Sequence, residues 1–422
     1  MKKLGIATGL IAILLIGACF ALPERFAVNV PLSNMLFGST EEAPANALLG
    51  TRIRAPEGFS VSFFATEVEN ARFLRFTERG DLLVSQPRRG KILLLERDGD
   101  GDGRSDGRRI LLEGLDGAQG MDLHGGWLYI AEASAIARVG FDSETGLVTG
   151  AVERIATGLP SGGNHWARTL RVGPDARLYV PIGSSCNVCE EEDPRRGALL
   201  RFELDGSGEE IVATGIRNSE GLDWQPGTGK LFVTDNGRDL LGDDFPPCEL
   251  NEIREGGFYG WPYANGDRVP DPDFGPENEK KIRNSIPPAH SFGAHQAPLG
   301  MTYIRSAQIP QAYRGAALVA LHGSWNRTSK AGYKVVSLHW SKGSEALEES
   351  CREVRFQKTQ VGDPKGRCSG IEERDFLWGF EVEEDVIGRP VDVVEGPDGA
   401  FYISDDFAGS IYRVAYAAAS SL

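Results

Sequence analysis

The stretch GPDGAFYISDDFAGSIYRV, residues 396–414, starts with a Pro-Asp-Gly turn and runs into an aromatic and aliphatic strand. A short polar link follows, and then a second strand. Gly and Pro at the turn and branched or aromatic residues beyond it are typical of antiparallel strands joined by tight turns. Five other segments repeat this order, namely ERGDLLVSQPRRGKILLLE (78–96), HGGWLYIAEASAIARVGF (124–141), GPDARLYVPIG (173–183), PGTGKLFVTDNGRD (226–239) and YRGAALVALHGSW (313–325).

The early copies recur about every fifty residues, which is the size of one four-stranded propeller blade. Six copies therefore predict an all-β fold, a six-bladed β-propeller with four-stranded antiparallel blades, over residues 50–418. Two later intervals are longer, and we interpret them as loop insertions. One contains ELNEIREGGFYGWPYANGD (249–267), and the other runs from SWNRTSKAGYK (324–334) to CREVRF (351–356).

The composition supports this fold and excludes some functions. The chain has 422 residues, of which 41% are hydrophobic, so a large core is available. Its 53 glycines and 23 prolines suit many short strands and turns. A net charge of −15, with no block rich in Lys and Arg, argues against a nucleic-acid partner.

The N-terminus predicts export. MKK precedes the apolar run LGIATGLIAILLIGACFAL, so residues 1–22 are a cleaved signal peptide, a lipoprotein signal with Cys19 as the lipidated residue, or an uncleaved membrane anchor. Residues 23–49 then form a linker. All three alternatives place the body in the periplasm or elsewhere outside the cytoplasm, and only the N-terminal segment touches a membrane.

The six cysteines fit an oxidising compartment. Cys351 and Cys368 bracket a polar loop, and we expect them to pair. Cys186, Cys189 and Cys248 are odd in number, which predicts one bridge and one remaining thiol.

An ordered set of motifs carries a resemblance to a known family. The motifs are AQG (118–120), GGNHWAR (162–168), GIRNSEGL (215–222), TDNGRD (234–239), ELNEI (249–253), GGFYGWP (256–262), HQAPLGM (295–301) and GRPVDVVEGPDGAFYISDD (388–406). In this order they resemble the soluble quinoprotein sugar dehydrogenases, in particular the sorbosone dehydrogenase-like branch. The resemblance implies a six-bladed propeller that uses pyrroloquinoline quinone (PQQ) and Ca²⁺ to oxidise an aldose or related sugar aldehyde. It also implies a quinone or a cytochrome as the electron acceptor.

The resemblance assigns three residues to catalysis. His165 matches the general base that removes the hydroxyl proton of the sugar, a task that suits imidazole. Arg217 matches a guanidinium that stabilises negative charge developing on the quinone oxygen. Gln119 lies where the family has a residue near both the quinone and the base. On residue type alone, each is also compatible with an ordinary structural role.

Other residues are expected to hold the cofactor. Besides Gln119 and Arg217, the resemblance implies contacts to PQQ from a set that comprises Asn218, Asn236, His295, Arg327 and Arg389. Arg389 pairs with PQQ carboxylates, and Arg327 substitutes for a family lysine. Val391 replaces a second family arginine, and Ser184 replaces an aspartate that glucose-oxidising members place beside the base.

Calcium is expected at two sites by resemblance. Backbone carbonyl oxygens of Gly237 and Arg238 would bind the ion next to PQQ, and Glu249, Tyr259 and Asp267 would form a structural site. Separately, DGDGDGRSDG (98–107) fits the first part of an EF-hand-like loop but lacks the glutamate at position twelve. It is either a weak calcium site or a solvated acidic turn.

Two rival functions remain open from the sequence. A calcium-dependent lactonase would need several carboxylates converging on one ion in the propeller, and no clear set is present. A non-catalytic propeller that binds carbohydrate or protein would need an open mouth with exposed aromatic residues and no cofactor.

Overall fold

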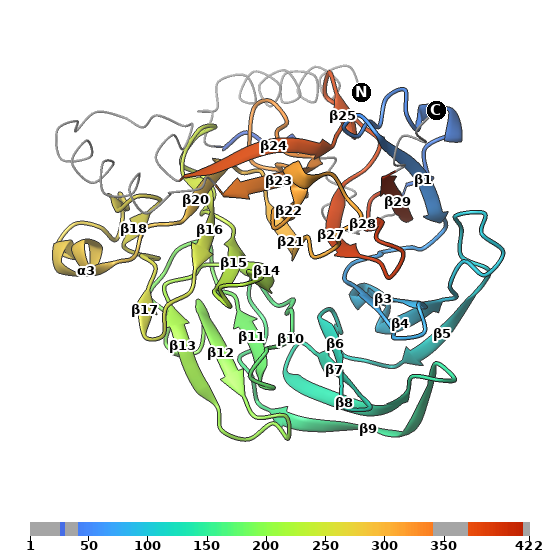
Figure 1. Cartoon of the computed structure of the whole chain (residues 1–422). Coiled ribbons are helices and arrows are strands. Elements are labelled where there is room, and N and C mark those ends of the chain that lie inside the picture. Colours follow the sequence, from blue (N-terminus) through green and yellow to red (C-terminus); the bar gives the residue numbers. More distant parts are fainter. Residues whose placement is uncertain (1–25, 30–40, 341–369, 417–422) are drawn as a thin grey trace, which may run out of the picture.

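Six antiparallel sheets surround one axis in the computed structural model, which describes residues 26–29, 41–340 and 370–416. The colours in Figure 1 follow one another around this ring, so consecutive blades are neighbours in space. The first strands of neighbouring blades lie against one another around the axis, and between blades three and four the link is an ion pair of Arg171 with Asp223. The predicted all-β, six-bladed propeller is confirmed.

Each blade follows the chain in order, from its inner strand outward, except at the closure. Blades one to three comprise β2 (Leu74–Phe76), β3 (Leu82–Gln86), β4 (Lys91–Leu95) and β5 (Arg108–Glu113); β6 (Met121–His124), β7 (Trp127–Ala131), β8 (Ala135–Asp142) and β9 (Leu147–Thr157); and β10 (Arg171–Val172), β11 (Leu178–Ile182), β12 (Ala198–Phe202) and β13 (Glu210–Thr214). Blades four to six comprise β14 (Ser219–Trp224), β15 (Leu231–Asp235), β16 (Pro247–Glu252) and β20 (His290–Ala294); β21 (Pro298–Tyr303), β22 (Ala317–Leu321), β23 (Lys334–Trp340) and β24 (Ile371–Leu377); and β27 (Pro390–Glu395), β28 (Phe401–Asp405), β29 (Ser410–Tyr416) and β1 (Phe59–Ala65).

The ring is closed by the two ends of the chain. Strand β1 pairs antiparallel with β29, with Phe59 opposite Tyr416 and Val61 opposite Val414. The last blade therefore combines one strand from the N-terminal part with three from the C-terminal part (Figure 1).

Successive side chains of a strand point to opposite faces of its sheet and fill the spaces on both sides of the blade. Leu128 and Ile130 of β7 pack against blade one, whereas Tyr129 between them packs against blade three. Six such apolar clusters are found in the described part of the chain, one between each pair of neighbouring blades. Because each sheet has two apolar faces, stacking around a ring buries both of them.

Ion pairs link the inner strands. Arg75 on β2 and Arg171 on β10 both contact Asp122 on β6, at 3.2 and 3.3 Å. Asp223 on β14 lies 3.6 Å from Arg171 and 2.8 Å from Arg305, which follows β21. These contacts connect five of the six blades close to the axis.

The first insertion is shorter than predicted. Residues 249–252 belong to β16, because Leu250 and its neighbour Cys248 are needed in the apolar cluster between blades four and five. The insertion itself runs from the end of β16 to β20. It contains β17 (Gly257–Phe258), which adds a fifth, parallel strand to blade three, the hairpin of β18 (Ala264–Asn265) and β19 (Val269–Pro270), and helix α3 (Glu279–Asn284).

The remaining short elements lie in connections. A second hairpin, of β25 (Glu381–Val382) and β26 (Asp385–Val386), precedes β27. Among the described residues, single turns of 3₁₀ helix also lie at Asn46–Leu48, Pro87–Arg89 and Gln311–Tyr313. Most of the second predicted insertion, including Cys351 and Cys368, lies outside the described residues.

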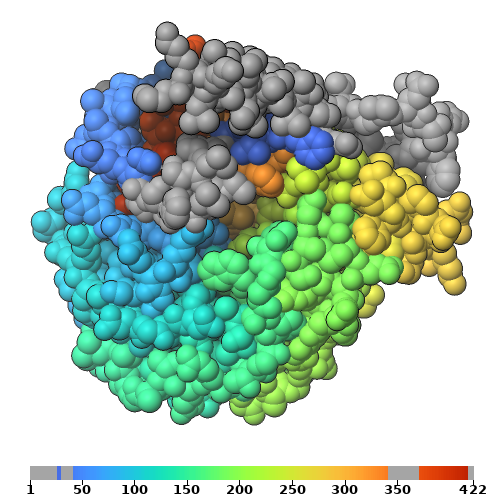
Figure 2. Space-filling model, turned by 180° about the vertical axis from the view of Figure 1, so that it is seen from behind, coloured from blue at the N-terminus to red at the C-terminus, as the bar shows by residue number. Residues whose placement is uncertain are grey.

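Part of the predicted linker contacts the propeller. The backbone N–H of Asn29 donates to the carbonyl oxygen of Trp325. The side-chain amide of Asn326 donates to the carbonyl oxygen of Ala27. Figure 2 shows residues 26–29 in blue beside the orange surface of blade five, on a face that is hollowed near its centre. Among the described residues, no helix has both the length and the apolar character needed to cross a membrane.

Candidate active site

A pocket of about 310 Å³ opens where the loops enter the inner strands. We call it the mouth pocket. Its walls come from segments before β2, β6, β10, β14 and β27, from the start of β14, and from segments after β3, β22 and β28. The lining residues are Asn70, Arg72, Pro87, Arg88, Gln119, Asn164, His165, Trp166, Ala167, Asn218, Glu220, His322, Arg389, Asp406 and Phe407.

Four predicted site residues meet in this pocket. Gln119, His165, Asn218 and Arg389 arrive from four different blades, separated by up to 270 residues in the sequence. A propeller brings such positions together because every blade presents equivalent loops at one mouth.

The ring of His165 is oriented by Ser184, which follows β11. Nδ1 of His165 lies 3.0 Å from the Ser184 carbonyl oxygen and 2.9 Å from its hydroxyl. That hydroxyl donates its only hydrogen to the carbonyl oxygen of Cys186 at 2.7 Å. Both groups facing Nδ1 are therefore acceptors, so Nδ1 carries the proton and Nε2 presents a lone pair.

Burial, and after it the positive charge of Arg217, lower the pKa of His165 to about 3. The imidazole is therefore neutral at physiological pH. A neutral imidazole with a fixed Nδ1–H is the form that accepts a proton at Nε2.

Arg217 is held entirely by protein groups and does not line the mouth pocket. Nε and Nη2 donate to the carbonyl and side-chain oxygens of Asn187, at 2.9 Å each. Nη1 donates to the carbonyl oxygens of Asn236 and Gly237, at 3.0 and 2.9 Å, and Nη2 also reaches Asp239 at 3.1 Å. All five N–H groups of the guanidinium are engaged.

Asn218 lines the pocket directly beside Arg217. The buried carboxyl group of Asp235 accepts the backbone N–H of both residues, at 2.9 Å from Arg217 and 2.6 Å from Asn218. Burial raises the pKa of Asp235 to about 7. Asp235 thus fixes the turn from which the Arg217 side chain enters the protein and the Asn218 side chain lines the pocket.

Arg389 lies at the edge of blade six. Its guanidinium donates to the carbonyl oxygens of His322 and Gly323, at 3.1 and 2.9 Å. Both acceptors are neutral, so they orient the guanidinium without cancelling its charge.

The pocket also contains a network of polar residues that the sequence motifs did not predict. Asp406 accepts from Arg72 at 3.0 Å and lies 2.8 Å from Nε2 of His322. Gln119 donates to Glu220 at 2.7 Å. Burial raises the pKa of Glu220 to about 6 and lowers that of His322 to about 4.

A sequence signal for two of these residues does exist. His322 and Asp406 each follow the second strand of a blade, at the end of the repeated segments ALVALH and FYISDD. Aligning the repeats by strand would place both of them at the mouth.

Three predicted cofactor contacts lie elsewhere. The side-chain amide of Asn236 donates to the carbonyl oxygens of Asn218 and Pro298. Nε2 of His295 lies 2.8 Å from the carbonyl oxygen of Gly242. Arg327 pairs with Asp244 at 3.1 Å. None of the three is among the residues lining the mouth pocket.

The predicted carbonyl ligands of calcium are partly occupied. The Gly237 oxygen accepts from Arg217. The side chain of Arg238 is buried between Asp271 and Asp273, at 2.7 and 3.0 Å, and so anchors the insertion after β16.

The three predicted ligands of the structural calcium lie in different surroundings. The Tyr259 hydroxyl donates to the carbonyl oxygen of Glu252 and accepts from the amide of Arg254, so it is engaged at the end of β16. Asp267 is exposed, whereas Glu249 is buried. Burial and the neighbouring Asp235 raise the pKa of Glu249 to about 8.

The acidic loop brings three carboxylates close together. Oxygens of Asp98, Asp100 and Asp106 lie within 4.8 Å of one another. Asp98 also accepts the backbone amides of Gly101 and Gly103, as in a closed acidic turn. Both readings from the sequence fit this geometry.

The family is decided by comparison with known proteins. Residues 68–336 match the family model described as glucose/sorbosone dehydrogenase. The chain belongs to the glucose/sorbosone dehydrogenase family. Residues 270–417 also match a model described as TrAA12-like.

Relatives in sequence cover part of the chain. An uncharacterized protein of Borreliella burgdorferi is 36% identical over 259 residues, which is 60% of this chain and 61% of that protein. Quinoprotein glucose dehydrogenase B of Acinetobacter calcoaceticus is 29% identical over 163 residues, 31% of this chain and 32% of that enzyme. The chain thus matches less than two thirds of the length of these relatives.

Solved structures share the fold. The PQQ domain of pyranose dehydrogenase from Coprinopsis cinerea, in its holo form, superposes with a TM-score of 0.69 at 19% identity, covering 88% of this chain and 98% of the domain. The PQQ-bound aldose sugar dehydrogenase from Streptomyces coelicolor gives 0.55 at 20% identity, covering 86% and 100%.

One departure from the glucose/sorbosone dehydrogenase pattern has a structural context. Val391, where a second arginine was expected, is fully buried and packs with Phe73 and Leu299. Arg72, from blade one, supplies a cation to the mouth pocket.

The cysteines near the site follow the prediction. Cys186 and Cys189 form a disulfide, and Cys248 is a buried thiol. One bridge and one remaining thiol were expected from these three.

Proposed function

We propose that this member of the glucose/sorbosone dehydrogenase family is a PQQ-dependent sugar dehydrogenase that oxidises an aldose or related sugar aldehyde. Electrons then pass to a quinone or cytochrome acceptor. The observation that carries the proposal is His165, a neutral imidazole with a fixed Nδ1–H at the wall of a cation-rich pocket. The C. cinerea and S. coelicolor structures that share the fold are described as PQQ proteins.

The mouth pocket fits the chemistry of PQQ. The cofactor carries several carboxylates, which guanidinium groups bind well. Arg72, Arg88 and Arg389 line the pocket, and His322 lies among them. The indole of Trp166 offers an apolar wall suited to a planar ring system.

Bound PQQ supplies an electrophilic carbonyl carbon that accepts hydride from the sugar. The chain supplies the proton acceptor, since Nε2 of His165 takes the hydroxyl proton as the C–H bond breaks. Carboxylates in the pocket would favour the imidazolium form and so raise the proton affinity of His165. The side-chain amides of Gln119 and Asn218 provide hydrogen-bond donors on the same wall.

Calcium forms part of the proposal through the Gly237 and Arg238 carbonyl oxygens. An ion at the Gly237 oxygen would replace the hydrogen bond from Arg217. One N–H group of Arg217 would thereby become available to an anionic partner. The deeply buried Glu249 is proposed to bind a second ion only if that ion displaces its proton.

We also propose that the protein works outside the cytoplasm, after export directed by residues 1–22. The Cys186–Cys189 bridge supports this proposal, because disulfides persist in oxidising compartments.

The rival readings find less support in the pocket. A lactonase would need carboxylates available for an ion, but Glu220 is engaged by Gln119, and Asp406 by Arg72 and His322. A purely binding propeller would not need a histidine held in one tautomer.

The proposal is tested by dye reduction with a panel of aldoses, with and without PQQ and Ca²⁺. We expect turnover only when PQQ is present, and strong loss on Arg389→Met. Failure of the purified chain to bind PQQ at micromolar concentration in the presence of Ca²⁺ would refute the proposal.

A further inference from the structure

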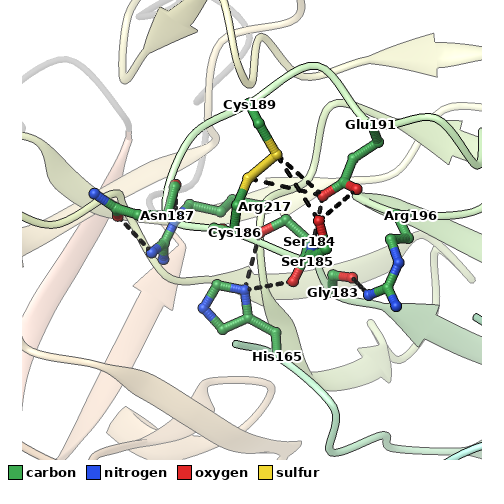
Figure 3. Close-up of a disulfide and its surroundings, with 10 residues drawn as sticks. All are labelled: His165, Gly183, Ser184, Ser185, Cys186, Asn187, Cys189, Glu191, Arg196 and Arg217. Carbon is green, nitrogen blue, oxygen red and sulfur yellow. Dashed lines mark hydrogen bonds between the residues drawn. A yellow bond between two sulfur atoms is a disulfide. The ribbon is translucent and has the colours of Figure 1, made fainter. Parts of the chain in front are cut away.

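The loop after β11 is closed by the Cys186–Cys189 bridge and contacts both His165 and Arg217 (Figure 3). The two cysteines are three positions apart in the sequence, so the bridge restrains a very short ring of chain. Such a restraint limits the backbone conformations available to the residues within it.

The Cys186–Cys189 bridge is connected to His165 through the hydroxyl group of Ser184. The carbonyl oxygen of Cys186 accepts the Ser184 hydroxyl hydrogen. That bond leaves the Ser184 oxygen as an acceptor for Nδ1–H of His165. If the Cys186 carbonyl turned away, the hydroxyl would be able to donate to Nδ1, and it would compete with the Ser184 carbonyl oxygen, which favours Nδ1–H.

The bridge reaches Arg217 through Asn187, which lies inside the ring. Asn187 accepts two of the five guanidinium hydrogen bonds, one on its backbone and one on its side chain. Its amide oxygen also accepts the backbone N–H of Asp239 at 2.8 Å, and its amide nitrogen donates to the Asp239 carbonyl oxygen. Asn187 therefore joins the ring to the turn that carries Gly237.

Glu191 secures the same loop from the other side. Its carboxylate accepts from the backbone and hydroxyl of Ser185, at 2.6 and 2.8 Å. One carboxylate oxygen lies 3.7 Å from the sulfur of Cys189. A negative charge at that distance disfavours a thiolate, which opposes opening of the bridge by thiol exchange.

We propose that the Cys186–Cys189 ring is a positioning element of the active site, which fixes the tautomer of His165 through Ser184 and the place of Arg217 through Asn187. The inference rests on the proposed function for its kinetic consequence. Cys186, Cys189, Ser184 and Asn187 act through other residues and are positioning residues.

Opening of the bridge has a simple balance. A phosphine reductant gives two electrons to the disulfide, two protons from water complete the thiols, and the phosphine takes the water oxygen as its oxide. Both cysteines are partly exposed, so a small reductant can reach them.

The test uses the full chain carrying Cys351→Ser and Cys368→Ser, so that the Cys186–Cys189 bridge is the one reduced. With the bridge open, we expect kcat for the best sugar to fall about 10- to 100-fold, as for displaced catalytic groups, with a smaller change in KM. Reoxidation should restore kcat. The matched control is the double variant Cys186→Ala/Cys189→Ala. Its kcat should equal the lowered value without reductant and should not change when reductant is added.

A second readout does not depend on activity. Ring ¹⁵N shifts of histidine in the chain without PQQ report which nitrogen of His165 is protonated, and His165→Ala identifies the signal. We expect Nδ1–H with the bridge closed, and a mixture of tautomers or Nε2–H with it open. Ser184→Ala should alter the same signal with the bridge intact.

The outcomes separate the two proposals. Thiol titration that shows an open bridge, with unchanged ¹⁵N shifts and kcat within about twofold, would overturn the positioning role. Absence of any PQQ-dependent activity in the oxidised protein would instead refute the proposed function, and the ¹⁵N shifts would still decide the inference. If the alanine pair does not fold, reversible reduction of the folded chain decides it alone.

Discussion

At the scale of single residues, charge explains how the mouth pocket selects its ligand. Arg389 is oriented by two neutral carbonyl oxygens, so its charge remains available to an anion. Arg72 shares Asp406 with His322, which reduces the net positive charge that it offers. Arg389 is therefore the stronger anchor of the two for a carboxylate.

We expect Arg389→Met to weaken PQQ binding about 10- to 100-fold, which corresponds to loss of one charge-assisted contact of about 1.5–3 kcal/mol. The long methionine side chain keeps most of the apolar packing against Tyr333. Fluorescence titration with PQQ measures the change. Arg104→Met, in the exposed acidic loop, serves as the control, and equal weakening in both variants would contradict the assignment.

The pocket histidines also predict a dependence of stability on pH. The pKa of His322 is lowered to about 4 by burial and by Arg389, from an ordinary value near 6.5. Between these pH values the unfolded chain binds a proton that the folded chain does not. The stability contributed by neutral His322 is therefore complete above pH 6.5 and is lost as the pH falls toward 4.

We expect acidification from pH 6.5 to 4.5 to lower the free energy of unfolding more in the wild type than in His322→Asn, by up to about 1.4 kcal/mol per pH unit. Buried carboxyl groups such as that of Asp405, whose pKa burial raises to about 7, act in the opposite direction. The comparison with the variant isolates His322. The free energy of unfolding is measured with urea at each pH. The same change with pH in the wild type and in His322→Asn would contradict the prediction.

At the scale of elements, β1 is the strand on which closure of the ring depends. It covers β29 and contributes Phe63 and Phe64 to the clusters on both sides of blade six. Without β1, the backbone groups of β29 and two apolar faces would be exposed.

We expect a chain that starts at residue 67 to lose cooperative unfolding or to aggregate, whereas a chain that starts at residue 41 should retain both its fold and its melting temperature. Calorimetry of the two chains tests this. A two-state transition of similar enthalpy in both would show that β1 is dispensable.

The extent of prediction from sequence also differs between elements. The repeated turn-and-strand segments predict the second strands of all six blades, because a strand that is buried on both faces leaves a local run of aliphatic and aromatic residues. Inner strand β10 has only two residues, and β17 pairs in parallel across blades, so neither leaves one. Residues 249–252 resembled a loop because three of the four are polar, although Glu249 and Asn251 are buried in β16.

The same reasoning applies to the site. Motifs predicted Gln119, His165, Asn218 and Arg389 at the pocket, and the structure brings them together. The engagement of Arg217 by Asn187 could not be predicted, because hydrogen bonds between separate loops leave no periodic trace. Arg72 was missed for the same reason, whereas aligning the repeated segments by strand would have placed His322 and Asp406 at the mouth.

At the scale of the whole molecule, the ion pairs near the axis couple the blades. Asp223 is buried and lies between Arg171 and Arg305, and it also accepts the amide of Tyr303. Removing one partner of a buried pair leaves uncompensated charge in the interior, at a cost of about 3–5 kcal/mol.

We expect Asp223→Asn to lower the free energy of unfolding by about that amount, because asparagine keeps the shape but not the charge. Asp385→Asn, which breaks an exposed pair with Arg52, should cost under about 1 kcal/mol. Chemical denaturation of both variants measures the difference. Equal effects would contradict an axial role for Asp223.

The central claim is that His165 removes a proton while a quinone bound in the mouth pocket accepts hydride. It is tested most directly by mixing the PQQ- and Ca²⁺-loaded protein with sugar and following the absorption of the bound quinone. The account predicts rapid bleaching in the wild type, slowed about 10²- to 10⁴-fold in His165→Ala with unchanged PQQ affinity. Equal bleaching rates in the two proteins would contradict it.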